Sequence, residues 1–117
     1  MADYTTINFA VENGELVMHA VARSTGKPYR HACPLASFEA IAHALDEAPD
    51  GLTREALRER TGLAWSRIAV ALLFLDERSI IDRKGKRGRL CIPATEAVHL
   101  DAMTEYHALR EGAGKEH

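Results

Sequence analysis

Apolar and polar residues alternate along the first part of the chain, which is the period of a β-strand with one buried face. Asn13-Gly14 interrupts the alternation, and this dipeptide is the preferred two-residue type I′ turn of a β-hairpin. A turn centred there places six apolar residues opposite one another, Val11 with Leu16, Phe9 with Met18 and Ile7 with Ala20. We therefore predict a hairpin with one face on a core, followed by a short third strand over residues 29–33.

The period changes to that of an α-helix after Pro34. Residues 34–48 place apolar side chains at i, i+3, i+4 and i+7, namely Phe38, Ile41, Ala42 and Leu45. Pro49-Asp50-Gly51 ends this amphipathic helix, and Thr53 is then the expected N-cap of a short helix that ends at Thr61-Gly62. A longer helix is predicted over residues 64–77, with Ile68, Ala71, Leu72 and Leu75 along one side.

The last part of the chain predicts a second hairpin and a final helix. Two short strand-like runs, residues 80–83 and 89–92, are joined by Gly85-Lys86-Arg87-Gly88, which makes a cationic hairpin tip. Thr95 is the expected cap of a helix with one apolar stripe, made of Val98, Ala102, Tyr106 and Leu109. Residues 112–117 are polar and are expected to form a disordered tail.

The composition is that of one compact globular domain. The chain has 117 residues, of which 46% are hydrophobic and 27% are charged, and this excludes a disordered or collagen-like chain. The longest apolar stretch, Ile68 to Leu75, is eight residues, whereas a membrane helix needs about 20. We expect no membrane partner. The first residues carry no secretory pattern, and a reducing cytoplasm is the expected compartment.

The net charge of the chain is −2, but its charged residues are unevenly distributed along the sequence. Residues 77–92 sum to +4, whereas residues 31–50 sum to −4 and residues 93–117 to −3. The positive charge is therefore concentrated in one short stretch. Such a distribution favours one directed contact with an anion over a generally cationic surface.

A short helix, a three-residue turn with glycine, a longer helix and a basic hairpin follow one another between Leu52 and Ile92. The first helix opens with Leu52-Thr53-Arg54-Glu55-Ala56-Leu57, and the turn is Thr61-Gly62-Leu63. This order resembles the winged helix-turn-helix of bacterial transcription regulators of the MarR-like and ArsR-like kind, over about Ser37 to Ile92. The resemblance implies an α+β fold with four parts: an N-terminal β-hairpin or meander (1–33), a winged helix-turn-helix domain (34–93), a C-terminal helix (94–111) and the tail (112–117).

The resemblance implies a transcriptional regulator that binds double-stranded DNA. Helix 64–77 would enter the major groove, and the wing, residues 84–89, would follow the backbone. The positions implied for the groove are Trp65, Ser66, Arg67 and Ala69, among which Arg67 is the residue suited to a bidentate contact with guanine. The positions implied for phosphates and the wing are Thr53, Arg54, Lys84, Lys86, Arg87 and Arg89.

Two apolar surfaces indicate that the chain could have protein partners as well as DNA. The C-terminal stripe is too apolar for a free helix, so we predict a homodimer through Val98, Ala102, Tyr106 and Leu109. Val70 and Leu73 project away from the buried side of helix 64–77, where a DNA-reading helix usually carries polar residues. That face is covered either by the N-terminal hairpin or by a second subunit. The alternative function is therefore a winged helix that contacts a protein partner through Val70 and Leu73.

Several residues could bind DNA or a metal ion, but each also has a simpler structural interpretation. The basic loop is also compatible with a solvated turn, and Trp65 with a packing residue. His31 with Cys33, and His99 with His107, lack the closed spacing of metal ligands, so no metal site is predicted. Cys33 and Cys91 are expected to be small buried groups. No phosphate-binding glycine loop or nucleophile motif is present, so we expect neither an enzyme nor a cofactor.

Overall fold

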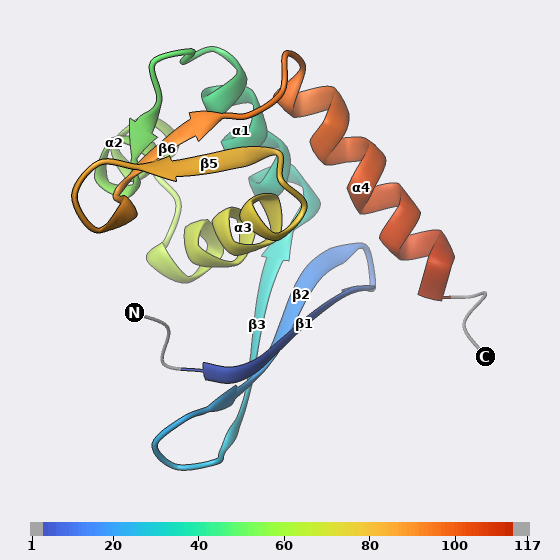
Figure 1. Cartoon of the computed structure of the whole chain (residues 1–117). Helices are drawn as coiled ribbons and strands as arrows, with labels where there is room; N and C mark the ends of the chain where they lie inside the picture. The colour runs from blue at the N-terminus through green and yellow to red at the C-terminus, as the bar shows by residue number, and fades with distance from the viewer. Residues whose placement is uncertain (1–3, 114–117) are drawn as a thin grey trace.

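The computed structural model describes residues 4–113, which form two three-stranded antiparallel sheets and four α-helices (Figure 1). Along the chain the elements are β1 (Tyr4–Glu12), β2 (Glu15–Ala22), β3 (Pro28–Pro34), α1 (Leu35–Asp46), β4 (Leu52–Thr53), α2 (Arg54–Thr61), α3 (Trp65–Glu77), β5 (Ile81–Lys84), β6 (Leu90–Pro93) and α4 (Val98–Ala113). A 3₁₀ turn, η1 (Lys86–Gly88), lies between β5 and β6. The predicted combination of helices with antiparallel strands is confirmed.

The first sheet has the strand order β1-β2-β3, and its register is the one that the turn predicted. Val11 lies opposite Leu16, Phe9 opposite Met18, and Ile7 opposite Ala20. Asn13 and Gly14 adopt φ angles of 52° and 78°, as a type I′ turn requires at both central positions. The third strand is also confirmed, and it is longer than expected by one residue at each end.

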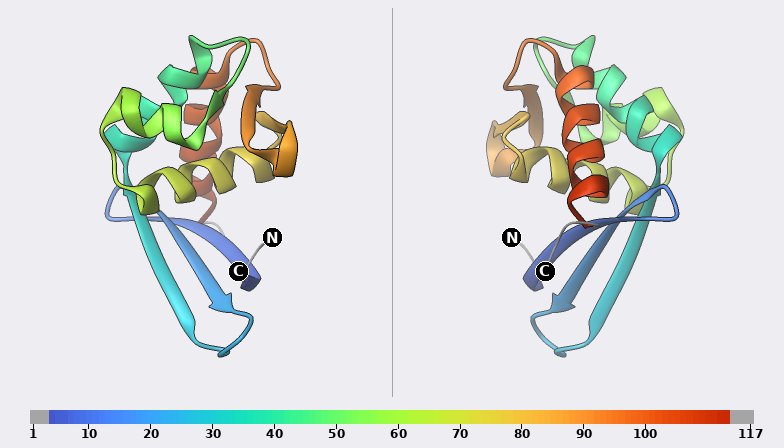
Figure 2. Two further views of the ribbon diagram at one scale, coloured as in Figure 1. Left: turned by 90° about the vertical axis from the view of Figure 1, so that its left-hand side faces the viewer. Right: turned by 90° about the vertical axis from the view of Figure 1, so that its right-hand side faces the viewer.

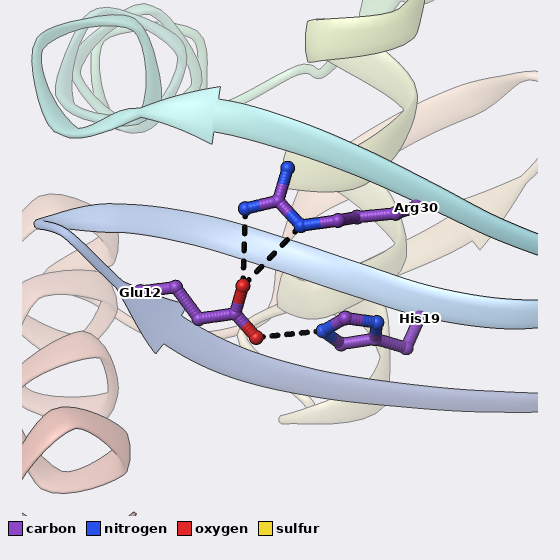
Figure 3. Close-up of polar contacts among 3 residues, drawn as sticks. All are labelled: Glu12, His19 and Arg30. Atoms are coloured by element: carbon purple, nitrogen blue, oxygen red, sulfur yellow. Dashed lines mark hydrogen bonds and ion pairs between the residues drawn. The ribbon is translucent and has the colours of Figure 1, made fainter.

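A polar cluster joins the three strands on the solvent face of the first sheet (Figure 3). Arg30 of β3 donates two hydrogen bonds to Glu12 Oε1, at 3.0 and 3.3 Å, and His19 Nε2 of β2 lies 2.7 Å from Glu12 Oε2. The hydrogen bond with His19 and then those with Arg30 lower the pKa of Glu12 below its ordinary value of 4.5. Both faces of this sheet therefore carry interactions: apolar on one side and ionic on the other.

The second sheet has the order β4-β6-β5 and connects the start of α2 to the later hairpin. Its two-residue strand β4, which the sequence analysis did not predict, pairs Leu52 with Cys91 and Thr53 with Leu90. Thr53 is also the predicted N-cap of α2, since its Oγ1 accepts a hydrogen bond from Ala56 N at 3.1 Å. The start of α2 is therefore held against the β5–β6 hairpin by strand pairing.

The first sheet covers one side of α3, while α1 and α2 lie on its other side (Figures 1 and 2). Phe74 joins the two layers, because its ring lies edge-on to Phe9 of the sheet, with centroids 5.3 Å apart, and to Phe38 of α1 at 5.7 Å. Val70 is completely buried. The sequence left two possibilities for what covers this face, the N-terminal hairpin or a second subunit. In the structure, the chain's own N-terminal strands cover it.

Helix α4 packs against α1 and β1 within the same chain. Val98 and Ala102 are fully buried, Tyr106 is 1% exposed, and Tyr106 Oη donates a hydrogen bond to Gly14 O at 2.7 Å. Leu109 is half-buried against the same core. Assigning this stripe to a dimer interface is therefore wrong, because the surface offered to a second subunit is already used inside the monomer. The homodimer itself stays a prediction.

The ends of α4 differ from the expectation. The helix begins at Val98, whose backbone N–H donates to Asp46 Oδ1 at 2.8 Å, whereas the hydroxyl of Thr95, the predicted cap, is buried without a hydrogen-bond partner among the described residues. Gly112 and Ala113 belong to the helix rather than to a tail, and residues 114–117 lie outside the described part. None of the helices within residues 4–113 is long and apolar enough to cross a membrane.

Candidate functional site

Ser66, Arg67 and Glu77 of α3 are exposed. The helix also has an open strip along one side, formed by exposed Trp65 and Asp76 and half-buried Ala69 and Leu73. These residues follow one another at intervals of four, four and three, so they share one side of the helix. Trp65 is 43% exposed, and the guanidinium of Arg58 lies 4.8 Å from the centre of its ring. Trp65 is thus a surface residue with a cation beside it rather than a buried packing residue.

Two grooves border this open strip. The helix–sheet groove, of about 520 Å³, lies between α3 and the first sheet and is lined by Tyr4, Met18, His31, Trp65, Ser66 and Leu73 among others. The second groove, of about 480 Å³, lies between α3 and the β5–β6 hairpin, and we call it the helix–wing groove after the wing that the sequence predicts. Ala69 and Leu73 line both, so the grooves are continuous along the helix.

Four arginines line the helix–wing groove: Arg54, Arg83, Arg87 and Arg89. Arg83 Nε is buried and lies 3.7 Å from Asp76 Oδ2, too far for a hydrogen bond but close enough for an ion pair. The other three are exposed and form no ion pair with another described residue. Unpaired guanidinium groups around one groove create a local positive potential that favours an anionic partner.

The remaining cations of the predicted wing lie nearby. Lys84 and Lys86 are exposed at the end of β5 and in η1, and neither forms an ion pair within residues 4–113. Thr53, predicted to face phosphates, is half-buried, and its oxygen already accepts the capping hydrogen bond from Ala56. Because the hydroxyl keeps its proton while its oxygen accepts this bond, Thr53 can still donate one hydrogen bond to an anion.

The structure corrects the position of Arg67. This residue lies two positions after Trp65 and two before Ala69, which places it about 160° around the helix from both. Its Nη1 donates to Ser37 Oγ of α1 at 3.4 Å. Arg67 therefore lies on the opposite side of α3 from Trp65 and Ala69, although its side chain is exposed. Its contact with DNA stays a prediction. The spacing was available in the sequence, but the orientation of the helix relative to the first sheet was not.

The apolar face assigned to a protein partner is also corrected. Val70 is fully buried beneath the first sheet, so it is inaccessible to another protein. Leu73 is half-buried in the wall of both grooves. Because Val70 and Leu73 have different surroundings, they do not form one free apolar surface.

The cysteines and histidines are arranged differently from the pairs considered in the sequence. Cys33 and Cys91 are buried free thiols, and burial raises the pKa of Cys33 to about 12 and that of Cys91 above its ordinary value. Burial thus keeps both thiols in the protonated form at neutral pH. Potential metal ligands gather elsewhere, where donor atoms of Glu39, His43 and His99 lie within 4.8 Å of one another. Sequence analysis missed this group because 56 residues separate His99 from His43.

Comparisons with protein-family models, with curated proteins and with solved structures found no match for this chain. No relative therefore supplies a function or a site by similarity. The function has to be inferred from the residues of the two grooves and their geometry.

Proposed function

We propose that this protein binds double-stranded DNA through the helix–wing groove and the adjacent tip of the β5–β6 hairpin. The observation that carries the proposal is the convergence of Arg54, Arg87 and Arg89, from two separate elements, without ionic partners among the described residues. A duplex presents closely spaced phosphates, and each one neutralised releases counterions, which favours binding. Lys84 and Lys86 extend the cationic surface along the hairpin tip.

The element order supports this proposal. We infer that α1, α2, α3 and the second sheet form a winged helix, because the chain order α1-β4-α2-α3-β5-β6 and the strand order β4-β6-β5 fit that arrangement. In a winged helix the hairpin is the element that follows the DNA backbone. The cationic tip of this chain lies on that hairpin.

The way in which α3 is covered changes the proposed mode of binding. A sequence-reading helix places polar side chains on base edges, but Trp65, Ala69 and Leu73 of the open strip offer no bidentate donor, and Asp76 would repel phosphates. Arg67 faces away. We therefore propose DNA binding dominated by phosphate contacts with weak sequence preference, in place of the sequence-reading helix that the resemblance implies.

Salt dependence tests the proposal directly. Binding of the protein to a fluorescent duplex is measured by anisotropy at several salt concentrations, for the wild type and for Arg87→Ala combined with Arg89→Ala. Because each lost phosphate contact removes about 0.9 from the slope of log K against log salt, the double variant should reduce that slope by about two units. The matched control is Lys27→Ala with Arg110→Ala, which removes the same charge from two exposed residues of other elements.

Two results would contradict the proposal. One is an absence of binding by the wild type at low salt, and the other is an equal loss of slope in the control variant. Arg67→Ala gives a further check, since a residue that faces α1 should leave both affinity and sequence preference unchanged. If Arg67→Ala instead relaxed the preference at one base pair, α3 would have to enter the groove in another orientation.

A further inference from the structure

A second cluster of polar side chains lies away from the grooves, where α1 meets α4. Glu39 and His43 are four residues apart on α1 and so share one side of that helix. His99 is in the first turn of α4, and its Nε2 lies 3.3 Å from Glu39 Oε2. Its ring stacks on that of His43, with centroids 3.7 Å apart and planes inclined by 14°.

The position of His99 follows from the packing beside it. The neighbouring residue, Val98, is fully buried, and its N–H is held by Asp46, three residues beyond His43 on α1. Glu39, His43 and Asp46 therefore form one polar stripe along α1 that faces the start of α4. Because Asp46 holds the first turn of α4, the His99 side chain is directed to the other two residues of the stripe.

We propose that Glu39, His43 and His99 bind one divalent transition-metal ion. One ligand atom from each residue lies within 4.8 Å of the other two. A tetrahedral ion with bonds of 2.0–2.1 Å needs its ligand atoms about 3.4 Å apart, and the separation between His99 and Glu39 is already 3.3 Å. His43 is exposed, so its ring is free to rotate out of the stack and direct a nitrogen to the ion.

The ligand types indicate which ions the site takes. Two imidazoles and one carboxylate suit Zn²⁺, Co²⁺, Ni²⁺ or Cu²⁺, whereas Mg²⁺ and Ca²⁺ prefer oxygen ligands alone. Three protein ligands leave a fourth position, and the partial exposure of Glu39 and His99 allows water to occupy it. The bound ion would link α1 to α4, and through Tyr106 it would also support the turn of the β1–β2 hairpin.

Calorimetric titration of protein without a histidine tag tests the site. We expect one Zn²⁺ or Co²⁺ per chain, a Co²⁺ absorption spectrum of a nitrogen and oxygen site, and a rise in the midpoint of thermal unfolding with Zn²⁺ but not with Mg²⁺. His43→Ala and His99→Ala should weaken binding at least about 100-fold. The matched control is His107→Ala, a histidine of the same helix that lies outside the cluster, and it should bind as the wild type does.

Three results would overturn the proposal: no Zn²⁺ binding by the wild type, unchanged binding in both cluster variants, or an equal loss in His107→Ala. His43 is exposed, so its replacement is expected to leave the fold intact, and circular dichroism of the metal-free variants verifies this. The metal site does not depend on DNA binding. If the protein did not bind DNA, the metal proposal would be unaffected.

Discussion

The two β-hairpins of this protein share a motif but differ in the environment of their side chains. The β1–β2 hairpin has strands of nine and eight residues, and its apolar face packs on α3 and α4. The β5–β6 hairpin has strands of four residues, and its tip carries exposed cations and no buried residue. Burial of apolar surface fixes the first hairpin to the core, whereas the second leaves its charged tip open to a partner. Apolar content therefore decides whether a hairpin covers a core or is available for contact.

The largest expected effect comes from placing a charge beneath the first hairpin. Val70→Lys buries an ammonium in an apolar layer, and such a lysine has to lose its proton at neutral pH, which costs about 4–5 kcal/mol of unfolding free energy. Urea denaturation at pH 7 measures this loss.

Leu73→Lys is the control for that experiment, because Leu73 is half-buried between the two hairpins. The long side chain of the introduced lysine can keep its ammonium group in water. We therefore expect the unfolding free energy to fall by only about 1 kcal/mol and binding to DNA to become tighter. Equal losses in the two variants would mean that the first sheet does not cover α3 in solution.

The two hairpin turns should respond differently to the loss of a glycine. Gly85 adopts φ 76° and ψ −171°, a region in which residues other than glycine are strained, so Gly85→Ala should cost about 2–3 kcal/mol. Gly14 has φ 78° with open space around it, and Gly14→Ala should cost about 1 kcal/mol. Thermal or urea unfolding of both variants compares the turns. A larger loss for Gly14→Ala would reverse this order.

The smallest effect concerns the ionic cluster on the outer face of the first hairpin. The pKa of Glu12 in the folded protein is lowered by His19 and Arg30, so its stabilisation is present above pH 4.5 and is lost as the pH falls through the folded value. The unfolding free energy of the wild type should therefore fall more steeply below pH 4.5 than that of Glu12→Gln. Identical pH slopes would show that the exposed cluster contributes nothing measurable.

Much of the local structure could be predicted because turns, caps and alternating patterns depend only on residues that are close together in the sequence. Asn13-Gly14 determined the register of the β1–β2 hairpin, since only one alignment brings its apolar residues together on one face. Thr53 and Gly62 marked the limits of α2 for equally local reasons, a side-chain cap and a left-handed backbone. The two-residue strand β4 was missed because its pairing with β6 depends on residues far along the chain.

The candidate site was predicted only in part. The sequence identified the cations of the hairpin tip and of α2, and their gathering around one groove depended on the pairing of β4 with β6. It also grouped Arg67 with Trp65 and Ala69, although the helical period places Arg67 on the opposite side of α3 from both. Which side of α3 the first sheet covers depended on the tertiary packing.

The sequence by itself determined which residues had to be buried, since an apolar stripe at a helical or alternating period is unfavourable in water whatever its partner. Only the tertiary structure decided what buries each stripe. Val98, Ala102 and Tyr106 suit a second subunit as well as they suit α1, because hydrophobic burial has no direction of its own. The meeting of Glu39, His43 and His99 likewise depends on how α1 and α4 pack, which no local pattern records.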